Sequence, residues 1–494
     1  MEGSVGVKGL LRSSFFYYTA GILNNLLGFA YWLVLSRIAG PGLIGYVSSS
    51  VALAMIMVGL LSLGAGVGIE RRVAGLLGEG RRDEASRVFW SAALVWGGIY
   101  AAAGGLLAAA APAASPALGL TGEQVVVAGV LLALGSSTLF SSLLMALLRT
   151  DVLMLAGVVG NLARLVGGVA LVLLGLGWVG AAAGYILLNL VVTAAGLLEA
   201  WRRLGFNPHI DPRLALGVAV VGLASWIPAT LMLAGRWLGV IFVFGSSSAA
   251  GAGRYYIAFT LAGFITGAGA SIATMLLPAL SMDKGLRGRA GRLVEASASL
   301  LAPVAIASAA AAPWLLGVLG PSYTSAAPAL VVLLASWIPV IYNTGFSSLL
   351  YSEDSYREAL GLGLARNIPR IILYILLTPV LGDLGAAVAY TAGSYSGLAY
   401  SLGRSADSRM GFSWRRPLKA SLLALLLIAP MLLAPLQPAP VIAGAAASYL
   451  AYCRLGVLRR SEVSVLASPL LRRGRRVRAV YERLKPVLDI VLPE

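Results

Sequence analysis

The chain has 494 residues, of which 59% are hydrophobic and only 12% are charged, whereas a soluble globular protein carries about 25% charged residues. Its formal net charge is +17, and it contains one cysteine (Cys453) and one histidine (His209). This composition excludes an ordinary soluble protein, a disulfide framework, a Cys/His metal site and a His-based catalytic triad within one chain.

Apolar runs long enough to cross a bilayer follow one another along the whole chain. We predict an all-α polytopic membrane protein with about fourteen transmembrane helices. The predicted spans are 14–38, 43–66, 88–112, 124–147, 152–176, 179–200, 214–244, 251–280, 293–318, 325–350, 356–380, 383–403, 417–435 and 438–456. The first run is too long for the core of a cleavable signal peptide and lacks a small-residue cleavage site.

Basic residues occupy alternate loops. The loops after spans 2, 4, 6, 8, 10 and 12 contain Arg71, Arg72, Arg81, Arg82, Arg87, Arg149, Arg202, Arg203, Arg213, Lys284, Arg287, Arg289, Arg292, Arg357, Arg404, Arg409, Arg415, Arg416 and Lys419. The opposite loops hold little beyond Arg37 and Arg254 at their edges. The positive-inside rule therefore predicts a multi-pass protein of the cytoplasmic membrane with both termini in the cytoplasm. We interpret the charge as a topology signal and a contact for anionic membrane lipids, not as a nucleic-acid footprint.

Two stretches about 205 residues apart match each other. Asp151 aligns with Asp354, Asn161 with Asn367, Arg164 with Arg370, and the Gly-Ala-Ala at 180–182 with that at 385–387. A shared offset across several positions indicates an internal repeat, which a single matching motif would not.

The repeat predicts four regions. We expect an N-terminal six-helix bundle at 1–205, a related C-terminal six-helix bundle at 206–410, two additional helices at 411–456 and a basic cytoplasmic tail at 457–494. The tail is compatible with an interfacial amphipathic helix and equally with a solvated basic segment.

Several glycine-rich motifs lie at helix ends. They are Arg37-Ile-Ala-Gly-Pro41-x-x-x-Gly45-Tyr46, Gly64-Ala-Gly66-Val-Gly68-Ile-Glu-Arg71, Gly320-Pro-Ser-Tyr323-x-x-Ala326 and Leu381-Gly-Asp-Leu-Gly385-Ala386-Ala387. Together these motifs resemble the polysaccharide and oligosaccharide flippases of the multidrug/oligosaccharidyl-lipid/polysaccharide exporter superfamily. The resemblance covers spans 1–12. It implies two six-helix bundles that alternate between inward-open and outward-open cavities and move a lipid-linked sugar across the membrane.

Charged residues inside spans are the candidate functional residues, because burial in a membrane is costly unless they have a role. Arg164, Arg236 and Arg370 lie within spans, Arg37 and Arg254 lie at outer ends, and no Asp or Glu lies at a span centre. This excess of arginine indicates an anionic passenger, since guanidinium groups bind phosphate oxygens well. The predicted substrate-binding set is Arg236, Arg37, Arg254, Asn24, Asn25, Arg164 and Arg370.

Other roles for these residues remain open. Arg37 and Arg254 could extend to lipid headgroups. Arg164 and Arg370 lie outside the main cavity that the family resemblance implies, and could instead hold the two repeats together. Pro228 and Pro339, each in a Trp-Ile-Pro motif, are either hinges for alternating access or plain helix kinks.

The predicted function is flipping of a lipid-linked oligosaccharide or polysaccharide unit, with its phosphate held by cavity arginines. The alternatives are a multidrug exporter of the same fold and a membrane-embedded glycosyltransferase. The chain contains no Gly-x4-Gly-Lys-Ser/Thr motif for ATP binding. We expect a monomeric transporter without catalytic residues, cofactor or metal.

Overall fold

The computed structural model describes residues 7–206, 208, 210–274, 287–407, 413–433 and 438–457. Within these ranges the chain is helical, with no β-strand. Eight of the described helices are long and apolar enough to cross a membrane, or nine if one bent pair forms a single span. The prediction of an all-α polytopic membrane protein is confirmed, while the count of fourteen spans stays a prediction. The basic tail lies outside the described residues from position 458 onward.

The chain divides into two compact units. Unit 1 contains Met1–Ile257 together with Tyr374–Ala386, and unit 2 contains Ala258–Leu373 and Ala387–Glu494.

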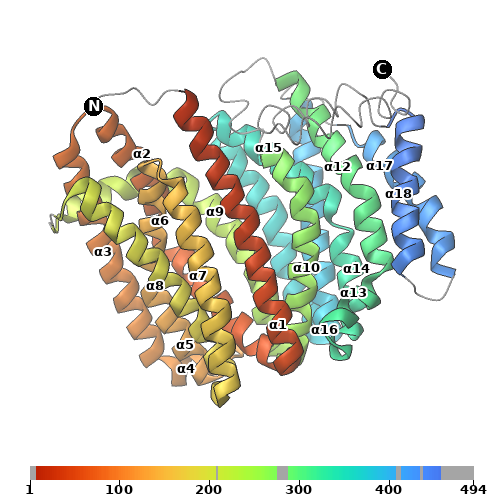
Figure 1. The fold of residues 1–494 in the computed structure, drawn as a ribbon, viewed down its shortest axis with the longest axis horizontal. Helices are drawn as coiled ribbons and strands as arrows, with labels where there is room; N and C mark the ends of the chain where they lie inside the picture. Colours follow the sequence, from red (N-terminus) through yellow and green to blue (C-terminus); the bar gives the residue numbers. More distant parts are fainter. Residues whose placement is uncertain are drawn as a thin grey trace. The chain divides into compact units, whose positions relative to one another are not determined.

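Unit 1 is built around its first helix. Its helices are α1 (Val7–Ser62), α2 (Ala65–Gly78), α3 (Arg82–Ala109), α4 (Ala111–Leu118), α5 (Gly122–Ala133), α6 (Ser137–Ala146), α7 (Thr150–Leu171), α8 (Gly177–Leu204), α9 (Pro212–Ser246) and the first turns of α10 (Ala249–Thr274). Helix α1, red in Figure 1, packs against α5, α7, α8 and α9. Helix α1 therefore lies against helices from both the early and the late part of this unit.

Glycines mark the breaks in unit 1. Helix α1 contains a non-helical residue at Gly40 (φ 69°, ψ 179°), which separates the first two predicted spans. The second of these spans was predicted to reach residue 66, but the helix ends at Ser62 because the chain breaks at Gly64 (φ 80°). A Cβ at Gly64 would lie 2.4 Å from the carbonyl carbon of Gly222 in α9, so the backbones of two helices touch here. Such close approach of transmembrane helices requires small residues.

Unit 2 is arranged around α12. Its helices are the remainder of α10, α12 (Arg287–Ala310), α13 (Ala312–Leu319), α14 (Ala327–Leu334), α15 (Trp337–Ser352), α16 (Tyr356–Asp407) apart from residues 374–386, α17 (Arg415–Ile428) and α18 (Pro438–Arg454). Helix α12 packs against α14, α15, α17 and α18. The segment Pro321–Leu334 and helix α15 meet at an angle of 46°, within the stretch predicted as one span.

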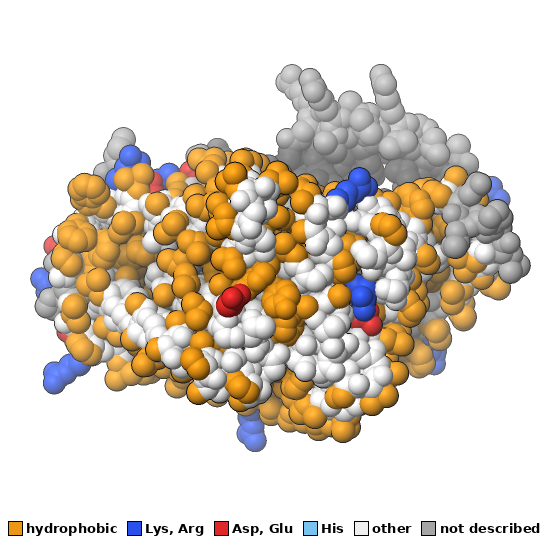
Figure 2. Space-filling model, turned by 90° about the horizontal axis from the view of Figure 1, so that it is seen from below, with side chains coloured by type: hydrophobic (Ala, Val, Ile, Leu, Met, Phe, Trp, Pro, Cys, Tyr) orange, Lys and Arg blue, Asp and Glu red, His pale blue; other side chains and the backbone are white. Residues whose placement is uncertain are grey.

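The surface is largely apolar. Figure 2 shows hydrophobic side chains spread over the visible face, with few charged groups among them. Large side chains such as Leu174, Val166 and Leu106 are 76%, 67% and 71% exposed. Exposed apolar area on this scale is unusual for a soluble protein, whereas it is expected for helices that face lipid. The protein is therefore a multi-pass membrane protein.

Local features recur at the repeat offset. Gly177 (φ 55°, ψ −137°) breaks the chain before α8, and Gly382 (φ 55°, ψ −126°) breaks α16 205 residues later. Leu148 (φ 54°) and Asp354 (φ 52°), 206 residues apart, are two of the three non-glycine residues with positive φ in the described chain. Helices α4 and α13 each have eight residues and a proline in their first turn. Similar local conformations thus recur at spacings close to the repeat offset, while the repeat itself stays a prediction.

Candidate functional site

Arg164 lies in an aromatic cage inside unit 1. Its side chain on α7 is 5% exposed, and its guanidinium carbon lies 4.7 Å from the ring centroid of Tyr31 on α1 and 4.8 Å from that of Tyr185 on α8. The Tyr31 hydroxyl donates to the Ala181 carbonyl at 2.5 Å, which fixes the ring. Cation–π contacts in a desolvated site contribute about 2 kcal/mol or more. The cage thus ties α1, α7 and α8 together.

A continuous run of aromatic rings leads from this cage to Arg236. Tyr31 contacts Trp32 (5.3 Å between centroids), and Trp32 contacts Tyr256 on α10 (4.8 Å). Tyr256 stacks on Trp237 of α9 at 6.0 Å with an interplanar angle of 18°. The guanidinium carbon of Arg236 lies 6.0 Å from the Trp237 ring centroid. We call these residues (Tyr31, Trp32, Arg164, Tyr185, Arg236, Trp237 and Tyr256) the arginine–aromatic cluster.

The cluster forms because adjacent residues on a helix point about 100° apart. Tyr31 therefore reaches Arg164 while Trp32, on the same turn of α1, reaches Tyr256, and both rings also contact Tyr185. Four of its five rings are at least 93% buried, at Tyr31, Trp32, Tyr185 and Tyr256. One end of the cluster is a buried guanidinium, and the other end is an exposed one, since Arg236 lies at the surface of the structure.

Gly235, beside Arg236, belongs to a packing face. It is buried, and its carbonyl accepts a hydrogen bond from the Tyr374 hydroxyl at 3.2 Å. Arg236 therefore extends from a helix whose neighbouring turn is held by Tyr374, so its backbone position is fixed.

Arg37 and Arg254 flank one helix crossing. A Cβ at Gly253 would lie 1.8 Å from the Pro41 carbonyl oxygen, so the start of α10 touches the kink of α1. Arg37 is exposed, whereas Arg254 is half-buried and forms an ion pair with Asp383 at 3.6 Å. Asp383 therefore neutralises part of the charge that Arg254 brings.

The predicted asparagines have different surroundings. Asn24 on α1 accepts a hydrogen bond from Asn161 of α7 at 3.1 Å, and Asn161 also donates to the Gly157 carbonyl at 2.9 Å. Asn25 is exposed. Asn24 thus joins two helices, and Asn25 lies where a ligand could reach it.

Arg370 is enclosed within unit 2. It is 1% exposed and donates to Asn367 Oδ1 at 3.0 Å, Ser394 Oγ at 2.9 Å and the Tyr390 carbonyl at 3.3 Å. Its guanidinium carbon lies 4.2 Å from the Tyr390 ring centroid. Tyr390 follows Arg370 by 20 residues in the sequence, and Tyr185 follows Arg164 by 21. These contacts join helices within a single unit, which differs from the predicted role of holding the two repeats together. Both the substrate-binding role and the repeat-joining role of Arg164 and Arg370 stay predictions.

Both candidate hinge prolines are buried within helices. Pro228 follows Trp226, whose indole nitrogen donates to the Gly59 carbonyl at 2.9 Å. Pro339 lies in the first turn of α15, just after the 46° bend. Proline frees the carbonyl four residues earlier, and at Ala335 that carbonyl accepts from Tyr395 at 2.9 Å. Each proline is thus accompanied by a side-chain hydrogen bond across helices.

Carboxylates at helix ends form local pairs. Glu199 is 5% exposed and pairs with Arg149 at 2.8 Å. Glu295 is 8% exposed and accepts from the Ser413 backbone at 2.7 Å. Burial raises the pKa of Glu70 in α2, although Ser142 donates to it at 3.1 Å. Among the described residues, no group of three or more His, Cys, Asp or Glu side chains could hold a metal ion.

A family model described as polysaccharide biosynthesis protein matches residues 10–283, more than half of the chain. The chain belongs to the polysaccharide biosynthesis protein family. The resemblance found in the sequence motifs is thereby confirmed. Comparison with curated proteins gave no match.

Solved structures show the fold that this family member shares. The lipid II flippase MurJ in an inward closed conformation superposes with a TM-score of 0.70 at 14% identity, over 92% of this chain and 99% of that one. A multidrug resistance MATE family transporter of the MOP superfamily, in an inward-facing conformation, gives 0.63 at 19% identity, over 78% and 95%. The MATE multidrug transporter DinF-BH in complex with R6G gives 0.59 at 19% identity, over 83% and 98%.

In this polysaccharide biosynthesis protein, the five rings of the arginine–aromatic cluster were not among the residues predicted from the sequence. The only sequence signal for these rings is that an aromatic residue directly follows another aromatic residue at Tyr31-Trp32 and directly follows an arginine at Arg236-Trp237. Arg366, which is half-buried one turn before Arg370, was not among the predicted residues either.

Proposed function

We propose that the protein moves a lipid-linked oligosaccharide or polysaccharide unit across the cytoplasmic membrane by alternating access. The family assignment carries this proposal, because it links the chain to polysaccharide synthesis. The fold shared with a lipid II flippase supports it.

In this proposal residues 1–205 and 206–410 form two related six-helix bundles, 411–456 adds two helices, and about fourteen spans leave both termini in the cytoplasm. The recurring backbone breaks at Gly177 and Gly382 support the repeat. The concentration of arginine in alternate loops supports the orientation. Pro228 and Pro339 act as hinges.

Arg236 is the proposed phosphate ligand, assisted by Arg37, Arg254 and the exposed Asn25. Its exposure and its backbone, fixed through Gly235 and Tyr374, support this role. Charge-assisted hydrogen bonds to phosphate contribute about 1.5–3 kcal/mol each. The neighbouring Trp237 ring offers an apolar face beside the guanidinium.

The test is translocation of a lipid-linked sugar in vesicles at matched expression. Arg236→Ala should lower transport roughly ten- to a hundredfold, since 1.4 kcal/mol corresponds to about tenfold. Arg236→Lys should rescue only partly, because lysine keeps the charge without the planar fork. Arg213→Ala, an exposed arginine at the start of the same helix, is the matched control and should transport as wild type. Wild-type transport by Arg236→Ala would remove this residue from the site.

A second candidate is an exporter of flat organic cations. The stacked rings of Trp237 and Tyr256 favour it, because such rings bind cations. The guanidinium groups of Arg164 and Arg236, at the two ends of the cluster, argue against this function because they would repel a cationic substrate. We therefore expect that a cationic dye does not compete with the lipid-linked sugar; competition would favour the exporter.

A further inference from the structure

Four arginines of unit 1 line an open cleft that the transport proposal does not use. The cleft has a volume of about 620 Å³ and is lined by Leu77, Arg82, Leu147, Arg149, Arg202 and Arg203. These residues come from the end of α2, the start of α3, the turn between α6 and α7, and the last turn of α8. We propose that this cleft binds a phosphate group, either that of an anionic phospholipid headgroup or free phosphate.

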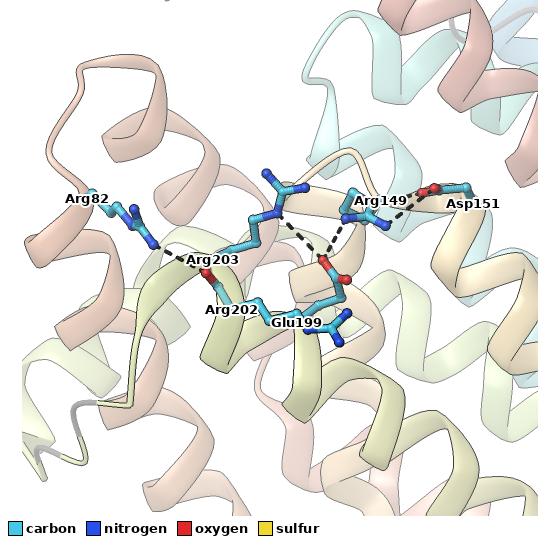
Figure 3. A network of polar contacts seen from close by, with 6 residues as sticks. All are labelled: Arg82, Arg149, Asp151, Glu199, Arg202 and Arg203. Carbon is cyan, nitrogen blue, oxygen red and sulfur yellow. Dashed lines mark hydrogen bonds and ion pairs between the residues drawn. The ribbon is translucent and has the colours of Figure 1, made fainter. Parts of the chain in front are cut away.

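A buried carboxylate holds two of the four guanidinium groups in place. Glu199 accepts a hydrogen bond from Arg149 Nη1 at 2.8 Å and pairs with Arg203 Nε at 3.7 Å (Figure 3). Asp151 holds Arg149 from its other side at 3.1 Å. Because anchored arginines lose little further freedom when a ligand binds, this arrangement is prepared for an anion.

Hydrogen bonds to backbone carbonyls hold the side of the cleft formed by α3 and α8. Arg82 Nη2 donates to the Arg202 carbonyl at 3.4 Å, which joins the start of α3 to the end of α8. The Trp90 indole nitrogen donates to the Gly205 carbonyl at 2.8 Å, just beyond α8. The guanidinium groups therefore project from helix ends that are fastened to one another.

The charge balance favours an anion. The cleft lining contains four guanidinium groups and no carboxylate. With the adjoining carboxylates of Glu199 and Asp151 subtracted, the formal net charge around the cleft is 4 − 2 = +2. A phosphate monoester carries about −1.5 to −2 at pH 7, and a phosphodiester carries one negative charge. Guanidinium forks match the geometry of phosphate oxygens.

The surroundings of the cleft favour a lipid as the source of the phosphate. Trp201, next to Arg202, is 65% exposed, and Phe206 and Ile210 are 64% and 68% exposed. Tryptophan is enriched at the level of lipid headgroups in membrane proteins. Leu77 and Leu147 provide an apolar edge to the cleft, beside which the glycerol and acyl portion of a lipid can lie.

The experiment measures binding to the purified full-length protein in micelles. The probes are inorganic phosphate, a short-chain phosphatidylglycerol and a phosphatidylcholine of equal chain length. The paired variant Arg82→Gln/Arg202→Gln should weaken binding at least tenfold, or about 1.4 kcal/mol. Both side chains are exposed, and the one contact between helices that their replacement removes is the long bond from Arg82 to the Arg202 carbonyl at 3.4 Å. Arg82→Lys/Arg202→Lys should bind with intermediate affinity.

Arg81→Gln is the matched control. Arg81 precedes Arg82, carries the same charge and pairs with Glu79 and Glu84 at 2.8 and 2.6 Å, but it does not line the cleft. A lipid site is identified if wild type binds phosphatidylglycerol more tightly than phosphate, and if this preference is lost in the paired Arg82/Arg202 variants but kept in Arg81→Gln. Equal binding of phosphate supports a site for the free anion. The proposal is overturned if no probe binds, if the paired Gln variant binds as wild type, or if Arg81→Gln weakens binding as much.

Discussion

Replacing Arg370 by methionine should destabilise the protein by about 1–3 kcal/mol, the cost of leaving a buried neutral acceptor without its hydrogen bond. The side chain is 1% exposed and makes three hydrogen bonds within unit 2, to Asn367, Ser394 and Tyr390. Charge-assisted bonds of about 1.5–3 kcal/mol each give a gross loss of about 4.5–9 kcal/mol. Methionine offsets part of this loss, because it does not require desolvation of a charge.

The acceptors left behind decide where in this range the effect falls. Ser394 keeps its bond to the Tyr390 carbonyl at 2.9 Å, so it stays satisfied without the arginine. Asn367 Oδ1 loses the Arg370 donor while its amide nitrogen remains bonded to Gly363. With one acceptor newly unpaired, we expect the lower half of the range. Arg370→Lys should be intermediate, since one ammonium group does not span all three partners.

The assay is denaturant unfolding of the purified protein in micelles, combined with transport in vesicles. Arg357→Met is the matched control, because Arg357 is exposed on the same helix, and it should change the free energy of unfolding by no more than about 0.5 kcal/mol. If Arg370→Met unfolded like wild type yet failed to transport, the residue would act on the substrate and the structural role would be refuted.

Three further predictions follow from unit 1. Gly64→Leu should abolish folding or insertion, because its Cβ would lie 2.4 Å from Gly222; normal yield in the membrane would contradict this. Burial raises the pKa of Glu70, so the folded state binds its proton more tightly than the unfolded state. Stability should fall as pH rises from about 4.3 through the folded pKa, and Glu70→Gln should remove that part of the pH profile of unfolding. Reporter fusions after Arg203 should report cytoplasm and those after Ala114 the outside, and the reverse result would refute the orientation.

The sequence by itself determined the membrane class and some of the places where its helices break, although it did not predict the end of α1 at Ser62 or the 46° bend before α15. In a bilayer each span must satisfy its own backbone hydrogen bonds, so runs of apolar residues translate directly into helices. Breaks such as Gly40 and Gly382 are equally local, because each adopts a positive φ that other residues rarely take. The repeat alignment also preserved local detail: Asn161 and Asn367 both donate to the carbonyl four residues earlier, at 2.9 Å.

Only the tertiary structure decided which groups surround each arginine. Arg164, Arg236 and Arg370 look alike in the sequence, since all three are charges within apolar runs. In the folded protein Arg164 contacts Tyr185, 21 positions away, and Arg370 contacts Tyr390, 20 positions away, whereas Arg236 is exposed. The cleft around Arg82 and Arg202 likewise joins residues 120 positions apart. Which side chains meet depends on how each helix is rotated against its neighbours, and that rotation is fixed by packing over the whole unit, which no local pattern in the sequence records.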